Sequence, residues 1–367
     1  YIDRKEVSRH KRAVTIKAMN KIKVGIIGAT GYAGAELVRL LVNHPAAEIT
    51  AVSSVSYEGQ QLADIYPNFK KILGDTLIST DELISRCDVV FASVPHGVSE
   101  EMAVKCAEAK CVLIDLGADF RLEDEADYQK WYGKEYKHPE LHGGAVYCIP
   151  ELHREKLGDC PIIANPGCYP TSIALGLMPA IKAGIIDTEH VIIDSKSGVT
   201  GSGRGLTQGT HYPDTNEAFA AYKAGCHRHT PEIAQTLSEL AGNRVKVTFV
   251  PHLLPVNRGI ESSMYVTLNE KGKGCDAEAL HNLYEDAYKN EYFVRIEKLG
   301  NYANIKNVRM SNFCDISLHL DTQSDTFIIS SVIDNMVKGA AGQAIQNMNI
   351  RFGIDEKAGL LTLPAAF

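Results

Sequence analysis

The segment ANPGCYPTS presents one cysteine, Cys168, in a setting that favours nucleophilic chemistry. Its Pro-Gly pair predicts a tight turn directly before the thiol, and the apolar run at residues 173–183 predicts a helix after it. We expect Thr171 and Ser172 to cap that helix. Because a helix N-terminus carries partial positive charge, we also expect the thiolate form of Cys168 to be favoured. A buried structural cysteine is the alternative interpretation.

Two histidines in the segment HRHTPEI, His227 and His229, are candidates for the general base. We expect Thr230 to cap a helix with Pro231 at its first position, which would hold His229 rigidly at the helix entrance. A structural histidine beside the cap is the alternative for either ring. A metal site that includes Cys226 is a further alternative, but no third and fourth ligand of suitable spacing stands out, and we predict no metal.

Arginines follow three predicted turns. Arg121 comes shortly after an apolar strand, Arg204 ends a loop rich in glycine and hydroxyl residues (195–204), and Arg258 shares a proline-braced turn with His252. A guanidinium binds phosphate or carboxylate through paired hydrogen bonds, so each arginine is a candidate for holding a substrate anion. Surface salt bridges and a flexible surface loop are the alternatives.

A glycine turn follows the first predicted strand. Residues 23–27 form a short apolar run that leads into GATGYAG (28–34) and then into a predicted helix at 35–42. In this order the first glycines allow a tight turn and a close approach of the backbone, while Gly34 lets the helix pack on the strand. The helix N-terminus then faces a pyrophosphate. We therefore predict a dinucleotide site, with a plain strand-to-helix turn as the alternative.

The next predicted strand, at residues 48–52, ends in Ser53 and Ser54 and not in an acidic residue. An acidic residue there would repel a 2′-phosphate, whereas small hydroxyls leave room for one, so NADP is favoured over NAD. Further strands at 89–92 and 112–115 lead into turns at the same sheet edge. His96, in the first of these turns, is expected to be structural or to lie beside the cofactor.

The second half of the chain has a different pattern of predicted elements, with several strands and few helices. The predicted strands lie at 191–194, 245–250, 262–268, 311–320 and 326–330, the predicted helices at 231–241 and 277–288, and a helix rich in small residues at 334–348. This pattern predicts a mixed or antiparallel sheet with helices on one face.

Composition limits the class of protein. The chain has 367 residues, a net charge of −7 and nine cysteines without a CxxC pair, which indicates a reduced, cytoplasmic protein with no general attraction for nucleic acid or membrane. No apolar run approaches the ~20 residues needed to cross a bilayer. Residues 1–20 are basic and polar, and we expect a disordered or non-native leader. The alternative is the remnant of a transit peptide, which would place the protein in an organelle stroma or matrix.

A dinucleotide fold, a reactive cysteine, a candidate base and loop arginines together define a reaction class. Thiolate attack on an acyl phosphate gives a thioester and releases phosphate, and hydride transfer then yields an aldehyde. The chain closely resembles the N-acetyl-gamma-glutamyl-phosphate reductases of arginine biosynthesis. The matching motifs are GATGYAG, DLGADFR, NPGCYPT, SGVTGSGR, HRHTPEI, PHLLPVNRG and DNMVKGAAGQAIQNMN, in family order from Ile22 to Gly353.

The resemblance implies a Rossmann-type doubly wound parallel sheet plus an α+β semialdehyde-dehydrogenase-like catalytic and dimerisation domain. We expect residues 21–166 and 334–367 to form the NADP-binding domain and residues 167–333 the catalytic, substrate and oligomerisation domain. The implied reaction is NADPH-dependent reduction of N-acetyl-glutamyl-5-phosphate to the semialdehyde and phosphate, with Cys168 as nucleophile. The implied assembly is a homodimer or homotetramer without nucleic-acid or membrane partners.

The motifs and the resemblance together predict the site residues. Catalysis is assigned to Cys168, His229 and His227, with the choice of base left open. Cofactor binding is assigned to Gly28, Thr30, Gly31, Tyr32, Ala33, Gly34, Ser53, Ser54, Ser93, Pro95, Ser197, Gly198 and Asn335. Substrate binding is assigned to Arg121, Asn165, Arg204, Glu232 and Arg258.

Other functions remain as alternatives. An aspartate-semialdehyde dehydrogenase would share the chemistry, but the HRHTPEI and DLGADFR segments argue against it. A reductase for the amino-adipyl analogue would differ only in substrate, and an NADP-sensing regulator would lack turnover. The chain departs from the family pattern at Ser172, where Gly or Ala is frequent, and only a local change in capping is expected.

Overall fold

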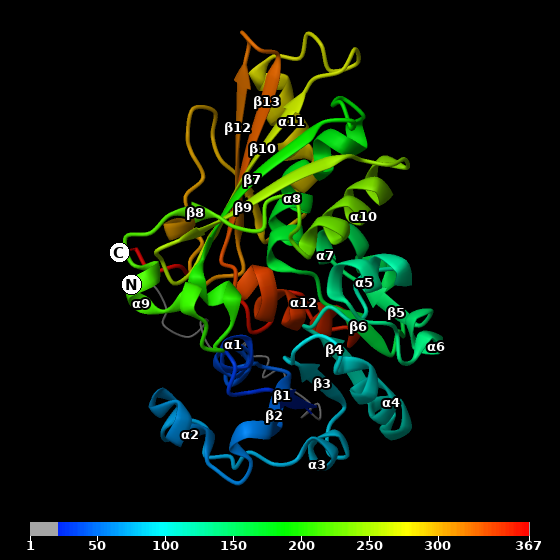
Figure 1. Cartoon of the computed structure of the whole chain (residues 1–367), viewed down its shortest axis with the longest axis vertical. Helices are drawn as coiled ribbons and strands as arrows, with labels where there is room; N and C mark the ends of the chain where they lie inside the picture. Colours follow the sequence, from blue (N-terminus) through cyan, green and yellow to red (C-terminus); the bar gives the residue numbers. More distant parts are fainter. Residues whose placement is uncertain (1–20, 367) are drawn as a thin grey trace, which may run out of the picture.

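A computed structural model of the chain describes residues 21–366 and shows two packed units, each built on one sheet (Figure 1). The predicted leader at residues 1–20 lies outside the described part. Within residues 21–366 no helix is both long and apolar enough to span a bilayer.

The first sheet is six-stranded, entirely parallel and ordered β2-β1-β3-β4-β6-β5. Its strands are β1 (Ile22–Ile27), β2 (Ala47–Ser53), β3 (Val89–Ala92), β4 (Val112–Asp115), β5 (Ala145–Tyr147) and β6 (Ile162–Ala164). The helices of this part of the chain are α1 (Tyr32–Leu41), α2 (Leu62–Ile65), α3 (Thr80–Ile84), α4 (Ser99–Ala109), α5 (Glu125–Tyr132), α6 (Pro139–His142) and α7 (Pro150–His153).

Apolar residues cover both faces of this sheet because strand side chains alternate between faces. Val24 and Ile26 pack with α1 on one face, whereas Ile27 and Val90 pack with α3 and α4 on the other. The final helix, α12 (Gly342–Arg351), returns to the α1 face through residues such as Ile345. This double covering confirms the predicted doubly wound parallel sheet.

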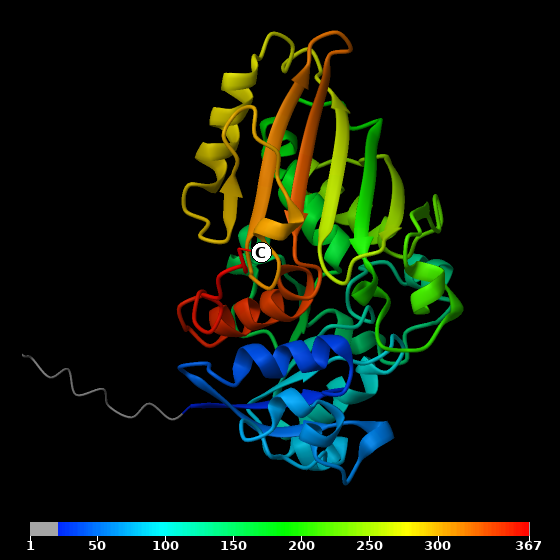
Figure 2. The ribbon, with the colours of Figure 1, turned by 90° about the vertical axis from the view of Figure 1, so that its left-hand side faces the viewer.

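The second sheet is mixed and seven-stranded, ordered β11-β12-β13-β10-β7-β9-β8. Its strands are β7 (Val191–Gly198), β8 (Ala220–Ala221), β9 (Val247–Leu254), β10 (Ile260–Thr267), β11 (Val294–Ile296), β12 (Cys314–Asp321) and β13 (Thr326–Ile333). Helices α8 (Cys168–Ala183), α10 (His229–Ala241) and α11 (Ala277–Tyr288) bury one face of it, while α9 (Tyr212–Thr215) lies in the loop before β8 (Figure 2). This arrangement confirms the predicted mixed sheet with helices on one face.

Several predicted boundaries are corrected. Helix α8 begins at Cys168 and not at residue 173, and β7 and β9 run through Gly198 and Leu254, so His252 lies within a strand and not on a turn. The predicted helix at 334–348 is a π-helical turn, η7 (Val337–Ala341), followed by α12. A π-turn inserts an extra residue into a helix. This turn lies close to Cys168, because a Cβ added at Gly339 would be 2.7 Å from the Cys168 Cβ.

Candidate active site

A cavity of about 560 Å³ lies between the carboxyl edge of the first sheet and the second unit. Its walls come from the glycine turn, the turns after β3 and β4, the Cys168 turn, the loop after β7, the start of α10 and the η7 turn. Its walls thus come from segments that are far apart in the sequence. Ligands of open parallel sheets bind at this carboxyl edge, so the cavity is the candidate binding site.

Cys168 occupies the first position of α8 and opens onto this cavity, with Gly167 as the N-cap residue. The predicted caps are wrong: the Thr171 hydroxyl donates to the Gly167 carbonyl at 2.9 Å, and the Ser172 hydroxyl donates to the Tyr169 carbonyl at 3.0 Å. Both hydroxyls thus bond to carbonyls as interior helix residues do. Cys168 therefore belongs to the first turn of α8, whereas the sequence predicted that it would precede the helix.

The predicted preference for thiolate is also wrong in this structure. Burial raises the pKa of the Cys168 thiol to about 11, and the Arg121 guanidinium and the backbone N–H of Tyr169 lower it by smaller amounts. Withdrawal from water therefore outweighs the helix end. The thiol is neutral at pH 7, so attack by its sulfur requires a base that takes its proton.

Alkylation of Cys168 checks this directly. We expect the rate of labelling by iodoacetamide to rise with pH through the neutral range and to level off only near pH 11, because the raised pKa keeps the thiolate fraction small at pH 7. Peptide mass spectrometry separates this site from the other cysteines. A plateau already reached below pH 7 would contradict the neutral thiol.

A buried ion pair holds the turn before Cys168. Glu232 is fully buried and accepts hydrogen bonds from the backbone N–H of Gly167 at 2.7 Å and from the Tyr147 hydroxyl at 3.1 Å. Arg121 donates to the Asn165 carbonyl at 2.9 Å, and its Nη1 lies 3.4 Å from Glu232. The Glu232 carboxylate does not line the cavity, in contrast to its predicted contact with substrate, because these partners occupy it.

His229 lies against the same turn. A Cβ added at Gly167 would be 2.7 Å from its Nε2, so the glycine lets the imidazole approach closely. Burial lowers the pKa of His229 well below its usual value, and the neighbouring His227 and Arg121 lower it further. The ring is therefore neutral and able to accept a proton. Thr230 is not the cap: α10 begins at His229 itself, after Arg228.

His227 is engaged elsewhere. Its Nδ1 accepts the backbone N–H of His229 at 3.1 Å, and its Nε2 lies 3.5 Å from the Tyr222 hydroxyl. Burial lowers its pKa to about 4. Since Nδ1 is an acceptor, the proton of the neutral ring is on Nε2. Both ring nitrogens of His227 thus have partners, which favours His229 as the base.

The glycine turn fits a dinucleotide. A Cβ at Gly34 would lie 2.8 Å from the Cα of Ala29, and one at Gly28, whose φ is +78°, would collide with the Ser93 carbonyl. These glycines therefore bring α1 and β3 close to the turn, and the N-terminus of α1 at Tyr32 opens onto the cavity. Free backbone N–H groups at a helix start suit a pyrophosphate.

Strand β2 ends at Ser53, Ser54 follows it, and both side chains are buried and do not line the cavity. The Ser54 hydroxyl lies 2.7 Å from that of Thr30. The segment Ser-Ser-Val-Ser-Tyr at 53–57 supplies neither a carboxylate nor a cation. Without a carboxylate, this position does not repel a phosphate on the ribose.

The structure brings most of the predicted residues to the cavity, but not all. Those that line it are Cys168, His227, His229, Gly31, Tyr32, Ala33, Ser93, Pro95, Ser197, Gly198, Asn335, Arg121, Asn165 and Arg204. Those that do not are Gly28, Thr30, Gly34, Ser53, Ser54, Glu232 and Arg258. Gly28, Thr30 and Gly34 shape the glycine turn from behind. Ser53 and Ser54 are buried at the end of β2, and Glu232 and Arg258 are held by protein partners.

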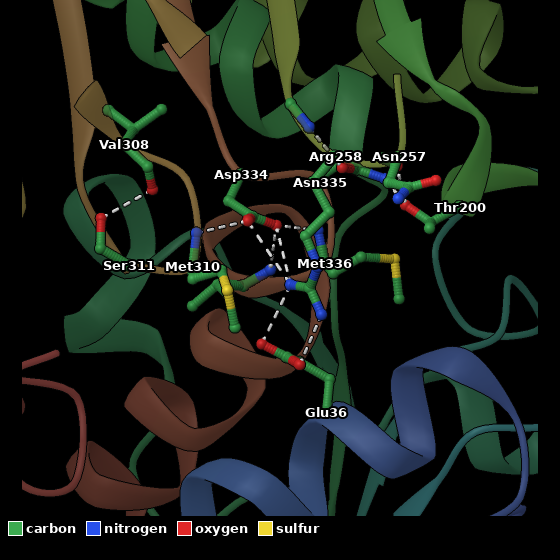
Figure 3. Close-up of polar contacts among 12 residues, drawn as sticks. Glu36, Thr200, Asn257, Arg258, Val308, Met310, Ser311, Asp334, Asn335 and Met336 are labelled. Atoms are coloured by element: carbon green, nitrogen blue, oxygen red, sulfur yellow. Dashed lines mark hydrogen bonds and ion pairs between the residues drawn. The ribbon is translucent and has the colours of Figure 1, made fainter. Parts of the chain in front are cut away.

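Arg258 bridges the two units and does not reach the cavity (Figure 3). Its Nη2 lies 2.7 Å from Glu36 on α1, and its Nη1 lies 3.4 Å from the buried carboxylate of Asp334. The next residue, Asn335, accepts the backbone N–H of Gly259 at 2.8 Å and donates to the Thr200 hydroxyl at 3.0 Å. The network therefore positions the loop after β7 relative to α1.

Replacement of Arg258 by methionine should lower the free energy of unfolding by about 3 kcal/mol, because the buried Asp334 loses its cation, whereas Glu36 keeps its pair with Arg39. Urea denaturation measures this. The matched control is Arg86→Met, which removes an exposed pair between Glu82 on α3 and Arg86 just after that helix and should cost less than about 1 kcal/mol. Equal small losses in both variants would show that the network contributes little.

Sequence reasoning missed Arg228, which lines the cavity between the two histidines of its motif. Its Nη1 lies 3.0 Å from His96 Nδ1, and its guanidinium lies 5.6 Å from the centre of the Tyr132 ring. Within residues 21–366 it forms no ion pair with a carboxylate. The signal was its place in HRHTPEI, where it is the cation nearest in sequence to the candidate bases.

The sequence matches two family models in chain order. Residues 23–160 match the semialdehyde dehydrogenase NAD binding domain, and residues 168–335 match the semialdehyde dehydrogenase dimerisation domain. Proteins named N-acetyl-gamma-glutamyl-phosphate reductase are 55% identical in Clostridium beijerinckii over 346 residues and 53% identical in Brachyspira hyodysenteriae over 353 residues, and each alignment covers 94% of this chain and 100% of the relative. The chain belongs to the N-acetyl-gamma-glutamyl-phosphate reductase family.

Solved structures with the same fold are more distant. An aspartate semialdehyde dehydrogenase II from Vibrio cholerae, complexed with ASA, has a TM-score of 0.71 at 16% identity and covers 91% of this chain and 99% of its own. The Candida albicans aspartate semialdehyde dehydrogenase with NADP has a TM-score of 0.66 at 17% identity, and covers 93% and 99%. At this identity the likeness shows the fold alone, and the shared fold confirms the predicted fold class.

Proposed function

We propose that this family member reduces N-acetyl-glutamyl-5-phosphate with NADPH, giving N-acetyl-glutamate-5-semialdehyde and phosphate in arginine biosynthesis. The observation that carries the proposal is the placement of Cys168, at the start of α8 and in one cavity with His229 and the glycine turn. The names and high identity of the curated relatives supply the substrate. The lower identity of the aspartate-semialdehyde dehydrogenases supports this choice over the aspartate substrate.

The residues around Cys168 divide the chemistry between them. His229 takes the thiol proton as the sulfur attacks the acyl carbon, the C–O bond to phosphate breaks, and a thioester remains on Cys168. Glu232 and Arg121 hold the turn that precedes Cys168, and His229 Nε2 lies against Gly167 of the same turn. After reduction, the oxyanion re-forms a carbonyl as the C–S bond breaks, and His229 returns its proton to the departing sulfur, so the aldehyde is released and the Cys168 thiol is restored.

The dinucleotide would be held by the turn at residues 28–34, the turn after β3 and the loop after β7, all of which reach the cavity. When bound, the nicotinamide supplies the hydride that reduces the thioester. Residues of the chain bind it and orient it toward Cys168. A Cβ at Gly339, in the η7 turn, would lie 2.7 Å from the Cys168 Cβ, so this glycine keeps the backbone close to the sulfur.

The substrate carries two anionic groups, and two arginines serve the catalytic part of the cavity. Arg121 is nearly buried and donates to the carbonyls of Asn165 and Leu116, so it acts chiefly as a brace. Arg228 lacks a carboxylate partner among the described residues and faces the cavity. An unpaired guanidinium suits a carboxylate or phosphate, so Arg228 is the better candidate for contact with a substrate anion.

We also infer the oligomeric state and the domain division of the protein. The match of residues 168–335 to a dimerisation domain supports a homo-oligomer, which we propose to be a dimer or tetramer. We also propose a division into an NADP-binding domain, formed by residues 21–166 and 334–367, and a catalytic domain at 167–333. The packing of α12 against the α1 face of the first sheet supports this boundary.

The reverse reaction tests the proposed substrate. Phosphate-dependent reduction of NADP should occur with N-acetyl-glutamate semialdehyde and be at least about 100-fold slower in kcat/KM with aspartate semialdehyde or the amino-adipyl analogue, because a pocket built for one chain length and acyl group discriminates strongly. A preference for either other aldehyde would overturn the substrate assignment. No turnover with any of the three aldehydes, together with binding of NADPH, would favour an NADP-sensing regulator.

A further inference from the structure

Arg204 is the other cation of the cavity wall that lacks a carboxylate partner within residues 21–366, and it lies at the glycine turn. Its Nη1 donates to the Thr30 carbonyl at 2.8 Å. The guanidinium also lies 5.1 Å from the ring centre of Tyr66 and 5.8 Å from that of Tyr57. Arg204 therefore belongs to the dinucleotide side of the cavity, although the chain places it in the second unit.

The groups beside Arg204 are those expected around the ribose of a bound dinucleotide. Thr30 and Ser54 place two hydroxyls 2.7 Å apart at the carboxyl end of β2, the position that decides between a free 2′-hydroxyl and a 2′-phosphate. The segment after β2 contributes no cation, and Val55, its third residue, is 90% exposed. Any positive charge for a phosphate at this position must come from another segment.

The loop that carries Arg204 is anchored before it reaches the glycine turn. The backbone N–H of Gly198 donates to the Gly259 carbonyl at 2.9 Å, and that of Val199 donates to the Val256 carbonyl at 2.9 Å. Thr200 bonds to Asn257 and to Asn335 (Figure 3). These bonds fix the start of the loop, at residues 198–200, to the second unit. Arg204 therefore extends to the first unit from a fixed position.

We propose that Arg204 binds the 2′-phosphate of the dinucleotide, so that preference for NADPH over NADH depends on a residue of the second unit. This inference rests on the proposed function only in assuming a 2′-phosphorylated cofactor. The Thr30 carbonyl is a neutral acceptor that the Tyr66 hydroxyl also reaches, at 3.0 Å. A phosphate offers charged oxygens, so the guanidinium would form stronger hydrogen bonds to a phosphate than to this carbonyl. The buried pair of Thr30 and Ser54 hydroxyls does not line the cavity, and it marks the carboxyl end of β2 at which the ribose is expected. The sequence-based assignment of Arg204 to a substrate anion is replaced.

Binding measurements on the full chain test the proposal without acyl phosphate. In Arg204→Gln the dissociation constant for NADPH should rise about 10- to 100-fold, as expected for loss of hydrogen bonds to a charged group, while that for NADH changes less than about twofold. Inhibition by 2′,5′-ADP should weaken in parallel, and inhibition by 5′-AMP should not. Arg204→Lys, which keeps the charge, should retain part of the preference for NADPH.

The control is Arg244→Gln, an exposed arginine that lines no part of the cavity, which should leave both dissociation constants unchanged. If Arg204 only ties the loop to Thr30, NADPH and NADH will weaken equally in Arg204→Gln, and this result overturns the proposal. An unchanged ratio of the two constants overturns it as well. Selective loss of NADPH in an enzyme that fails to reduce N-acetyl-glutamyl phosphate would support the proposal and reject only the proposed substrate.

Discussion

Replacement of Cys168 by serine should lower kcat/KM with the acyl phosphate by roughly 10⁴-fold or more, because a serine hydroxyl at this position has no comparable nucleophilicity at neutral pH. The dissociation constant for NADPH should change less than about twofold, since the substitution leaves the glycine turn untouched. Stopped-flow assays and fluorescence titration measure the two quantities.

Cys226→Ser is the matched control for that substitution. Cys226 is exposed and does not line the cavity, so its replacement should leave both activity and cofactor binding unchanged. Activity of Cys168→Ser close to that of the unsubstituted chain would remove Cys168 from the mechanism. Equal losses in both cysteine variants would indicate a general effect on folding.

The second large effect is expected at the histidines. His229→Asn should lower kcat by about 10²- to 10⁴-fold if, as we propose, the neutral imidazole next to the Gly167 turn takes the thiol proton. His227→Asn should lower it by less than about tenfold, since the His227 ring bonds to the backbone and to Tyr222. The pH profile of kcat/KM checks the ranking.

A positioning role and a proton-transfer role differ in that profile. Loss of the base in His229→Asn should leave an activity that rises with pH, because hydroxide and the growing thiolate fraction replace it. His227→Asn should keep the pH dependence of the unsubstituted chain. The opposite ranking, with the altered profile in His227→Asn, would assign the base to His227.

Much of the fold follows from local sequence patterns. The bounds of α11, β3 and β4 agree with those predicted from their apolar runs, and the glycine turn follows β1 as expected. The helix starts were less predictable. Thr171 was expected to cap α8, but its hydroxyl donates to a carbonyl four residues earlier. Threonine does both near helix ends, and the sequence does not distinguish the two bonds.

The remaining differences depend on contacts between distant residues. Arg258 was expected to bind substrate, yet its main partner, Glu36, lies 222 residues away in the sequence. The pKa of Cys168 depends on burial that only the packed units create. Arg204 and Arg228 resemble other loop arginines in sequence, and only the structure shows that both lack a carboxylate partner within residues 21–366. The proposals that Arg204 contacts the cofactor and Arg228 the substrate therefore depend on their surroundings in the structure and not on their motifs.

The most direct test of the mechanism is to incubate the enzyme with N-acetyl-glutamyl phosphate in the absence of NADPH and analyse the Cys168 peptide by mass spectrometry. We predict an N-acetyl-glutamyl adduct on Cys168 that hydroxylamine removes, formed together with a burst of phosphate close to one equivalent per chain. Steady turnover with NADPH but no adduct on Cys168 and no phosphate burst would contradict the thioester mechanism.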